Sequence, residues 1–273
     1  MDVTLQLADY YILDAVYPQN WQKDDIYRQI ISLFFITWLG GLAIYYIFAT
    51  LNFYFIFDKQ LMKHPKFLKN QINKEIILSM KSMPVMAILT VPWFLGEVRG
   101  YSKLHLQTPT EVSDYLDMAV SILGFLAFTD MAIYWIHRWE HHPLLYPIIH
   151  KPHHRWIIPT PFASHAFHPF DGYAQSVPYH MYIFLFPMHS YLYLLLFVLI
   201  NLWTISIHDG YFMTEGGILN SSAHHAVHHT DFLYNYGQYT TFWDKMGGTY
   251  RKPKEALFKT KQAQQKIVFN KQS

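Results

Sequence analysis

Four long apolar stretches, separated by shorter polar segments, dominate the chain. Ile30–Phe57 has no charged residue over 28 positions, and Ile76–Gly96 and Met118–Ile136 each contain a single one. A helix needs about 20 mostly apolar residues to cross the hydrocarbon core of a bilayer. These three stretches therefore predict membrane-spanning helices.

The fourth apolar stretch, Val177–Ile207, is too long for a single crossing. As one helix of 31 residues it would be roughly 45 Å long, against a hydrocarbon core of about 30 Å. Pro187 divides it, so we expect a hairpin of two helices that enters and leaves on the same side. The four stretches together predict an all-α polytopic membrane protein, with about four transmembrane helices in hairpins.

Charged residues are distributed unevenly between the ends of these predicted spans. Residues 1–29 hold five Asp against one Lys and one Arg, whereas residues 58–75 hold five Lys. Because basic loops remain in the cytosol, segment 58–75 is predicted to be cytosolic, and the third span returns the chain to that side. We expect one membrane-embedded domain over residues 1–255, with a helical histidine-rich catalytic cap on the cytosolic face. Residues 256–273 are predicted to be a basic cytosolic tail.

The composition supports a membrane location and restricts the chemistry. Hydrophobic residues make up 52% of the chain and charged residues only 15%, whereas soluble domains contain about 25% charged residues. The chain has no cysteine, which excludes disulfides, thiolate nucleophiles, iron–sulfur clusters and Cys-containing zinc sites. It has 17 histidines, so a bound metal would be held mainly by imidazole. The net charge of +2 gives no reason to expect a nucleic-acid partner.

Three histidine clusters indicate a metal site: HRWEH at 137–141, HKPHH at 150–154 and HAVHH at 225–229. Spacings of three and four residues place the imidazoles of each cluster on one face of a helical turn. Eight neutral ligands are too many for one ion, so the clusters predict two metals close together. We interpret these eight as the catalytic residues, and two further histidines as ligands that complete the coordination. The predicted metal ligands are His137, His141, His150, His153, His154, His168, His208, His225, His228 and His229.

Carboxylates near the clusters are candidates to orient the ligands. Asp130 lies within a predicted span, seven residues before His137, and so projects from nearly the same helix face. An acid inside a membrane helix is costly and is a functional candidate by default. We expect Asp130 to accept the second ring N–H of a ligand histidine, the alternative being an acid paired with another helix. Asp209 is a second candidate of this kind, and Asp171, Asp231 and Asp244 are either such acceptors or turn residues.

The ordered clusters resemble those of the membrane-bound fatty acid hydroxylase superfamily of non-haem iron enzymes. The flanking strings KPHHRWIIPTPFASHAFHPFDG, WTISIHDG and HHTDFLYNYGQYTTFWDKMGGTY resemble sterol C5-desaturases, also called lathosterol oxidases, and the likeness covers about residues 1 to 255. The resemblance implies that a Δ7-sterol such as lathosterol is converted to the Δ5,7-diene (7-dehydrocholesterol) at the endoplasmic reticulum membrane, in sterol biosynthesis. It also implies two iron ions, O2 as oxidant, and electrons from NAD(P)H through a reductase and cytochrome b5.

Two alternative functions use the same features. A hydroxylase of the same superfamily, such as a C4-methyl sterol oxidase or a fatty acid 2-hydroxylase, shares the three clusters, so only its product separates it from a desaturase. A metal transporter or metal sensor would need polar residues along a path across the bilayer. Asp130 is the clearest residue of that kind within the predicted spans, so this reading has little support.

Overall fold

The computed structural model describes residues 1–210 and 217–253 of the chain. Three helices in this part are long and apolar enough to cross a membrane, namely α3 (Ile26–Phe55), α4 (Gln71–Val98) and α5 (Val112–Glu140). They correspond to the first three apolar stretches of the sequence, and each begins a few residues before the stretch does. Side-chain caps mark the starts of α3 and α5. Asp25 accepts the backbone N–H groups of Tyr27 and Arg28 at the start of α3.

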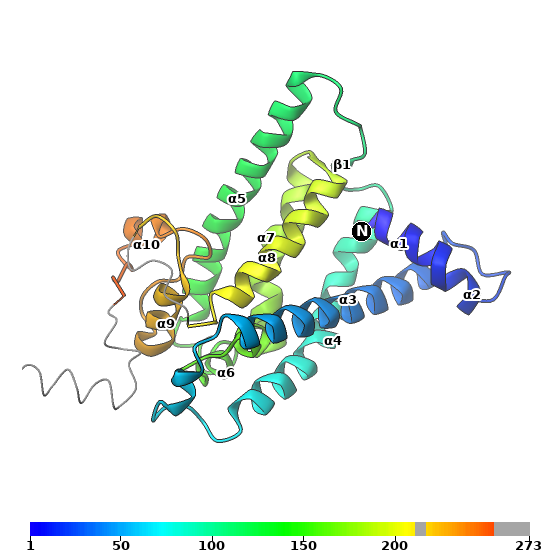
Figure 1. The fold of residues 1–273 in the computed structure, drawn as a ribbon. Coiled ribbons are helices and arrows are strands. Elements are labelled where there is room, and N and C mark those ends of the chain that lie inside the picture. Colours follow the sequence, from blue (N-terminus) through cyan, green and yellow to red (C-terminus); the bar gives the residue numbers. More distant parts are fainter. Residues whose placement is uncertain (211–216, 254–273) are drawn as a thin grey trace, which may run out of the picture.

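The fourth apolar stretch forms two helices, as the hairpin prediction requires. α7 (Pro169–Leu185) ends just before Pro187 and α8 (Ser190–Ser206) begins just after it. Figure 1 shows α7 and α8 lying side by side and next to α5. At the turn between them, strand β2 (Met188–His189) pairs in parallel with strand β1 (Leu104–His105). The helix pair α7–α8 returns the chain to the end of the bundle from which α7 started. The histidines that precede α7 in the sequence can therefore meet those that follow α8.

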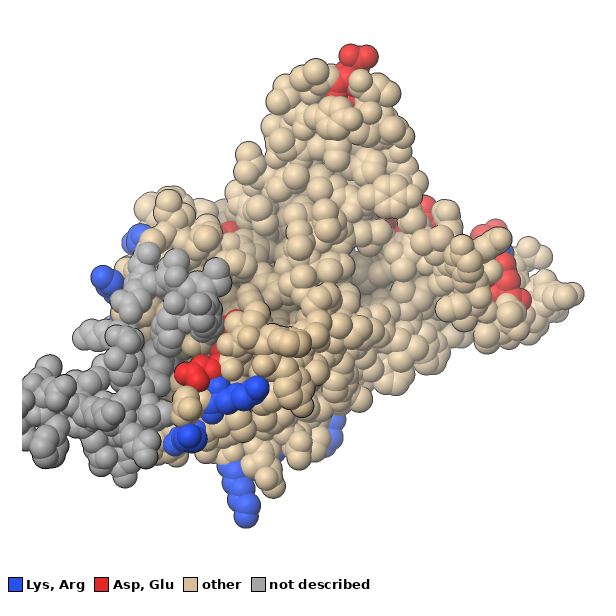
Figure 2. All heavy atoms as spheres, in the orientation of Figure 1, with Lys and Arg blue, Asp and Glu red and all other residues tan. Residues whose placement is uncertain are grey.

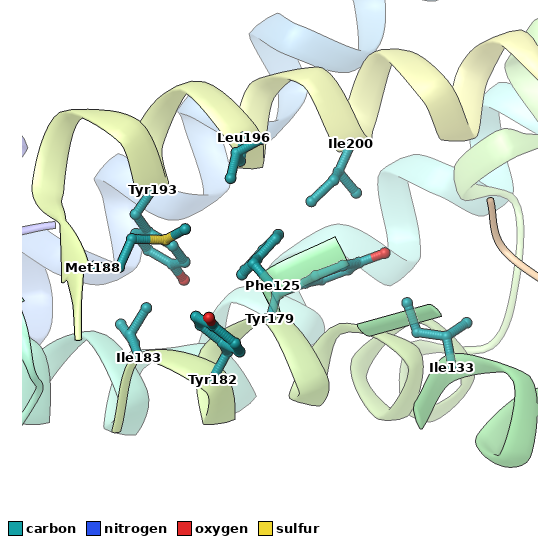
Figure 3. Packing of buried hydrophobic residues seen from close by; sticks show 9 residues of the cluster. All are labelled: Phe125, Ile133, Tyr179, Tyr182, Ile183, Met188, Tyr193, Leu196 and Ile200. Carbon is teal, nitrogen blue, oxygen red and sulfur yellow. The ribbon is translucent and has the colours of Figure 1, made fainter. Parts of the chain in front are cut away.

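A hydrophobic core fixes α5 against the α7–α8 pair. Figure 3 shows its side chains projecting from the three helices into one cluster. Phe125 on α5 packs edge-to-face against Tyr182 on α7, with ring centroids 5.2 Å apart. Burial of such aromatic residues makes a large contribution to core stability, and here it sets the position of α5 relative to the hairpin. The cluster consists of Phe125, Ile133, Tyr179, Tyr182, Ile183, Met188, Tyr193, Leu196 and Ile200.

Short elements occupy the two ends of the helical bundle. Near the N-terminus, the buried Arg28 of α3 pairs with Asp9 at 2.6 Å and with Asp14 at 2.9 Å, which ties the first turns to the first span. These turns are α1 (Asp2–Ala8), the π-helix η1 (Asp9–Leu13) and α2 (Asp14–Val16). The opposite end carries the 3-10 helices η2 (Lys59–Lys63) and η3 (Pro161–His165), and the helices α6 (Lys151–His154), α9 (Ser222–Asp231) and α10 (Phe242–Met246).

The two ends differ in charge. In Figure 2, most of the visible Lys and Arg side chains lie at the end that carries α6 and α9, whereas acidic side chains mark the far ends of α3 and α5. The predicted basic tail, residues 256–273, lies outside the described residues. The basic end of the described part is therefore the end to which the histidine clusters belong.

Candidate metal centre

The structure brings nine of the ten predicted ligands together, in two groups. In each group the ligand nitrogens lie within 4.8 Å of one another. The C-terminal end of α5, the segment through α6, the second residue after α8 and helix α9 supply them. His168 belongs to neither group: it caps the start of α7, where its ring accepts the N–H of Phe170. The first group is His137, His141, His150, His154 and His228, and the second is His153, His208, His225 and His229.

In the first group, ring nitrogens face one another across a small space. The Nε2 atoms of His137 and His150 lie 3.0 Å apart, and those of His141 and His154 lie 3.1 Å apart. The buried Nε2 of His228 has no hydrogen-bond partner among the described residues. Metal–imidazole bonds of about 2.0–2.1 Å at right angles would place neighbouring nitrogens about 3.0 Å apart. The spacing therefore fits nitrogens that share one ion.

The second group has the same arrangement. The Nε2 of His225 lies 2.9 Å from that of His208 and 3.0 Å from that of His229. His153 joins them through its own Nε2, 3.4 Å from that of His208. His208, which sequence analysis could place only as an additional ligand, thus lies inside this group.

Backbone carbonyls determine which ring nitrogen of three of these histidines would face a metal. A carbonyl oxygen can only accept a hydrogen bond, so each of these rings carries its proton on Nδ1 and leaves Nε2 free. The bonds run from His137 to Tyr236 O (3.0 Å), from His208 to Thr204 O (2.7 Å) and from His228 to Tyr234 O (2.8 Å). Two of the three acceptors belong to the segment that follows α9, so this segment orients ligands without supplying any.

A buried carboxylate orients His150 in the same way. Asp171 Oδ2 accepts the Nδ1–H of His150 at 2.7 Å, and both side chains are fully buried. Burial raises the pKa of Asp171 to about 6, an effect that nearby histidines oppose. Glu140, on α5, lies next to the same pair and forms with them a third group of possible metal ligands. Glu140 is not among the residues predicted from the sequence, although its place inside HRWEH, three residues after His137, is a usable signal.

Asp130 orients the site through the backbone, which differs from the expectation. It accepts the N–H of Tyr239 at 2.7 Å, the N–H of Thr240 at 3.2 Å and the hydroxyl of Thr240 at 2.5 Å. No hydrogen bond joins Asp130 to a ligand histidine in the part of the chain that the structure describes. Asp130 instead holds the segment that presents the Tyr236 carbonyl to His137. Asp209, buried beside His208, accepts a hydrogen bond from Asn52 at 3.4 Å.

Asp244 holds the same segment from its other side. Its carboxylate accepts the N–H groups of Tyr236 at 2.8 Å and of Gly237 at 2.9 Å, and the hydroxyl of Thr249 at 2.8 Å. Of the two roles that the sequence left open for this residue, the structure gives it that of a turn residue. The turn it stabilises carries the carbonyl that fixes His137.

The histidines are held in the neutral form that binds metal. Burial lowers the pKa of His150 to about 3 and that of His208 to about 4. Burial, and then the neighbouring histidines, lower the pKa values of the remaining ligands on α6 and α9 well below 6.5. Nine neutral rings whose nitrogens converge in a buried space can offer their lone pairs to cations. The donor set therefore fits two metal ions, one for each group.

A cavity connects the metal centre to the membrane helices. It has a volume of about 500 Å³, and α3, α4, α7 and α8 form its walls. Its lining includes histidines of both groups, namely His137, His150, His153, His208 and His225. The remaining walls are mainly apolar, with Met83, Phe94 and Phe197 among them. This volume falls within the range of about 300–1,000 Å³ typical of small-molecule sites.

A bundle of membrane helices with a buried polyhistidine centre and an attached apolar cavity defines a class of membrane metalloprotein. Residues 122–249 match the model of the fatty acid hydroxylase family. The chain belongs to this family, and several relatives of high identity place it in one branch. It is 54% identical to the lathosterol oxidase of Homo sapiens over 257 residues, which cover 93% of this chain and 86% of the relative.

Fungal relatives agree with this branch. The chain is 54% identical over 243 residues to a Delta(7)-sterol 5(6)-desaturase of Aspergillus fumigatus, covering 89% of this chain and 69% of that protein. It is 50% identical over 262 residues to a Delta(7)-sterol 5(6)-desaturase of Schizosaccharomyces pombe, covering 94% and 86%. No solved structure matches the chain.

Proposed function

We propose that this chain is an oxidoreductase that desaturates Δ7-sterols such as lathosterol between C5 and C6, giving the Δ5,7-diene. The names of its relatives support this substrate class. The observation that carries the proposal is the cavity, because it joins an apolar space between membrane helices directly to both histidine groups. A sterol dissolved in the bilayer would enter between the helices and reach the metals without passing through water.

The reaction balances with O2 as the oxidant. The sterol loses one hydrogen from C5 and one from C6, two electrons and two protons come from outside, and O2 leaves as two waters. Two iron ions held by the nine histidines would supply the oxidising chemistry that an unactivated C–H bond requires, and imidazole nitrogen is a suitable donor for iron. Substrate binding uses the apolar walls, which exclude water from the reacting carbons and position one edge of the rings.

The charge distribution supports a proposal for the orientation of the protein in its membrane and for its electron donor. Segment 58–75, which carries five lysines, lies at the end of the bundle that also carries α6 and α9 (Figure 1). Basic loops favour the cytosolic side, so we place the metal centre at the cytosolic face of a multi-pass protein of the endoplasmic reticulum membrane. This basic end would also suit an acidic electron carrier, and we propose cytochrome b5, reduced by its NAD(P)H-dependent reductase, in that role.

Sterol analysis tests the proposal directly. A cell that lacks sterol C5-desaturase should regain the Δ5,7-diene, seen by its ultraviolet absorbance and mass, when it expresses this chain. The His228→Ala variant, at matched protein level, is the control that should not restore it. The match to a family of hydroxylases favours hydroxylation as a second candidate function. A product heavier by one oxygen, without diene absorbance, would establish hydroxylation and overturn desaturation.

A further inference from the structure

One side chain on the cavity wall has a fixed orientation and an unused hydrogen-bonding atom. Gln175, on α7, lines the cavity. Its Nε2 donates to Glu140 Oε2 at 2.9 Å and to Asp171 Oδ1 at 2.8 Å. Both amide hydrogens are therefore used by carboxylates, and these two bonds come from different elements, α5 and the start of α7.

The Asp171 carboxylate determines which way the amide points. An ionised carboxylate can only accept hydrogen bonds, and Asp171 Oδ1 lies 2.8 Å from Gln175 Nε2, so the NH2 end of Gln175 faces Asp171 and the carbonyl oxygen faces the other way. This oxygen accepts no hydrogen bond from the described part of the protein. An acceptor left unpaired in an apolar cavity is unfavourable, so this position favours a ligand that donates a hydrogen bond.

The position of Gln175 relative to the metals matches the chemistry of a sterol. Asp171 accepts from Gln175 through one oxygen and from His150 through the other, so Gln175 is two hydrogen bonds away from a metal ligand. In a 3β-hydroxysterol the hydroxyl oxygen is only three bonds from C5, one of the carbons that react. A residue that binds this hydroxyl must therefore lie beside the metal centre, while the rings and side chain extend into the apolar part of the cavity.

Thr37 Oγ1 and Trp38 Nε1 on the wall also lack a hydrogen-bond partner among the described residues, but no carboxylate fixes either of them. Several other polar side chains on the wall are paired within the protein. His165 and Asn201 face each other at 3.4 Å. Gln238, whose amide donates to Thr204 at 3.2 Å, is the nearest chemical equivalent of Gln175. Its amide has no carboxylate partner among the described residues, so nothing comparable fixes its orientation. This makes Gln238 a matched control.

We propose that the Gln175 carbonyl oxygen accepts a hydrogen bond from the 3β-hydroxyl of the sterol and so determines which ring edge faces the metals. The proposal rests on the sterol-desaturase function and names the recognition contact of that substrate. Gln175 would then select for sterols with a hydroxyl donor at C3. Sterols with a ketone, a methyl ether or only hydrogen at that carbon cannot donate, and they would leave the carbonyl unpaired.

The test compares three substrates on each enzyme preparation. We would measure kcat/KM for lathosterol and for its 3-deoxy and 3-O-methyl analogues, with wild type, Gln175→Met, Gln175→Asn and Gln238→Met in reconstituted membranes. The wild type and Gln238→Met should prefer lathosterol about tenfold or more. Gln175→Met should be slower overall but prefer lathosterol less than about twofold. Gln175→Asn, which draws the amide back by one methylene, should also lose most of the preference.

The possible outcomes distinguish a failure of the Gln175 contact from a failure of the proposed desaturase function. Any loss of metal caused by changing Gln175 lowers activity toward all substrates equally, so the ratio between substrates reports only the contact at C3. A wild type that does not discriminate, or a Gln175→Met or Gln175→Asn variant that keeps the full preference, would overturn the proposal while leaving the desaturase function intact. If the wild type forms no diene from any of these sterols, the function itself is wrong.

Discussion

The hydrogen bond between His150 and Asp171 offers the sharpest test of how the metal centre is oriented. Asp171→Asn keeps the size of the side chain but replaces one carboxylate oxygen with an NH2 group. In the wild type Asp171 accepts from two donors, His150 Nδ1 at 2.7 Å and Gln175 Nε2 at 2.8 Å. An asparagine has only one side-chain oxygen, so it cannot accept from both donors through separate oxygens. Its NH2 group would then face one of the two donors in a fully buried position.

The size of the effect follows from the burial of this pair. Hydrogen bonds to charged groups contribute about 1.5–3 kcal/mol, and both His150 and Asp171 are inaccessible to solvent. A loss of this size corresponds to roughly a ten- to hundredfold weaker metal affinity. Changes to the partners that orient metal-binding histidines have effects of about the same size. We therefore expect Asp171→Asn to weaken metal binding by about ten- to hundredfold.

Metal affinity should be measured by competition with a chelator of known affinity, in purified detergent-solubilised protein. Asp231→Asn is the control, because Asp231 pairs with Arg251 at a more exposed site at the end of α9 and should leave affinity unchanged. Circular dichroism of the metal-free variants should show the same helix content. Wild-type metal affinity in a folded Asp171→Asn protein would refute the orienting role.

Four further predictions follow from the same geometry. His228→Ala and His153→Ala, one from each group, should each abolish turnover while the protein stays in the membrane. The control His142→Ala, at an exposed position beside the first cluster, should retain turnover. Turnover in either ligand variant would argue against two required ions. Chelation should lower the thermal midpoint reversibly, since metal at a hundred times its Kd contributes about 2.7 kcal/mol; an unchanged midpoint would count against metals that join α5, α6 and α9. Asp130→Ala should lower the free energy of unfolding by about 1–3 kcal/mol in denaturant titrations, because buried backbone N–H groups lose their acceptor. An unchanged free energy of unfolding would mean that contacts other than those of Asp130 hold residues 239–240 in place. Asn220, in an Asn-Ser-Ser sequon, is buried and donates to the Gly237 carbonyl, so glycosidase treatment should not shift the protein's mass; a shift would also place this end of the bundle in the lumen.

Much of the metal centre could be predicted from the chain because the relevant signals are local. Spacings of three and four residues place imidazoles on one helix face whatever the rest of the protein does. The division of the clusters between two sites was not predicted. His153 and His154 are adjacent, yet they belong to different groups, and His228 is separated in the same way from His225 and His229. The physical reason is that successive helical residues point about 100° apart, so one short helix can serve two ions.

The sequence by itself determined the apolar spans, the break at Pro187 and the identity of the clustered ligands, because hydropathy, proline and helical spacing act between near neighbours. Only the tertiary structure decided how the ligands are oriented. It assigned Asp171 and the Tyr236 carbonyl to two ligand rings and gave Asp130 the backbone of a distant segment. These contacts join residues as many as 110 positions apart. They depend on how α5, the α7–α8 hairpin and the C-terminal segment pack against one another. Sequence patterns between near neighbours do not predict this packing.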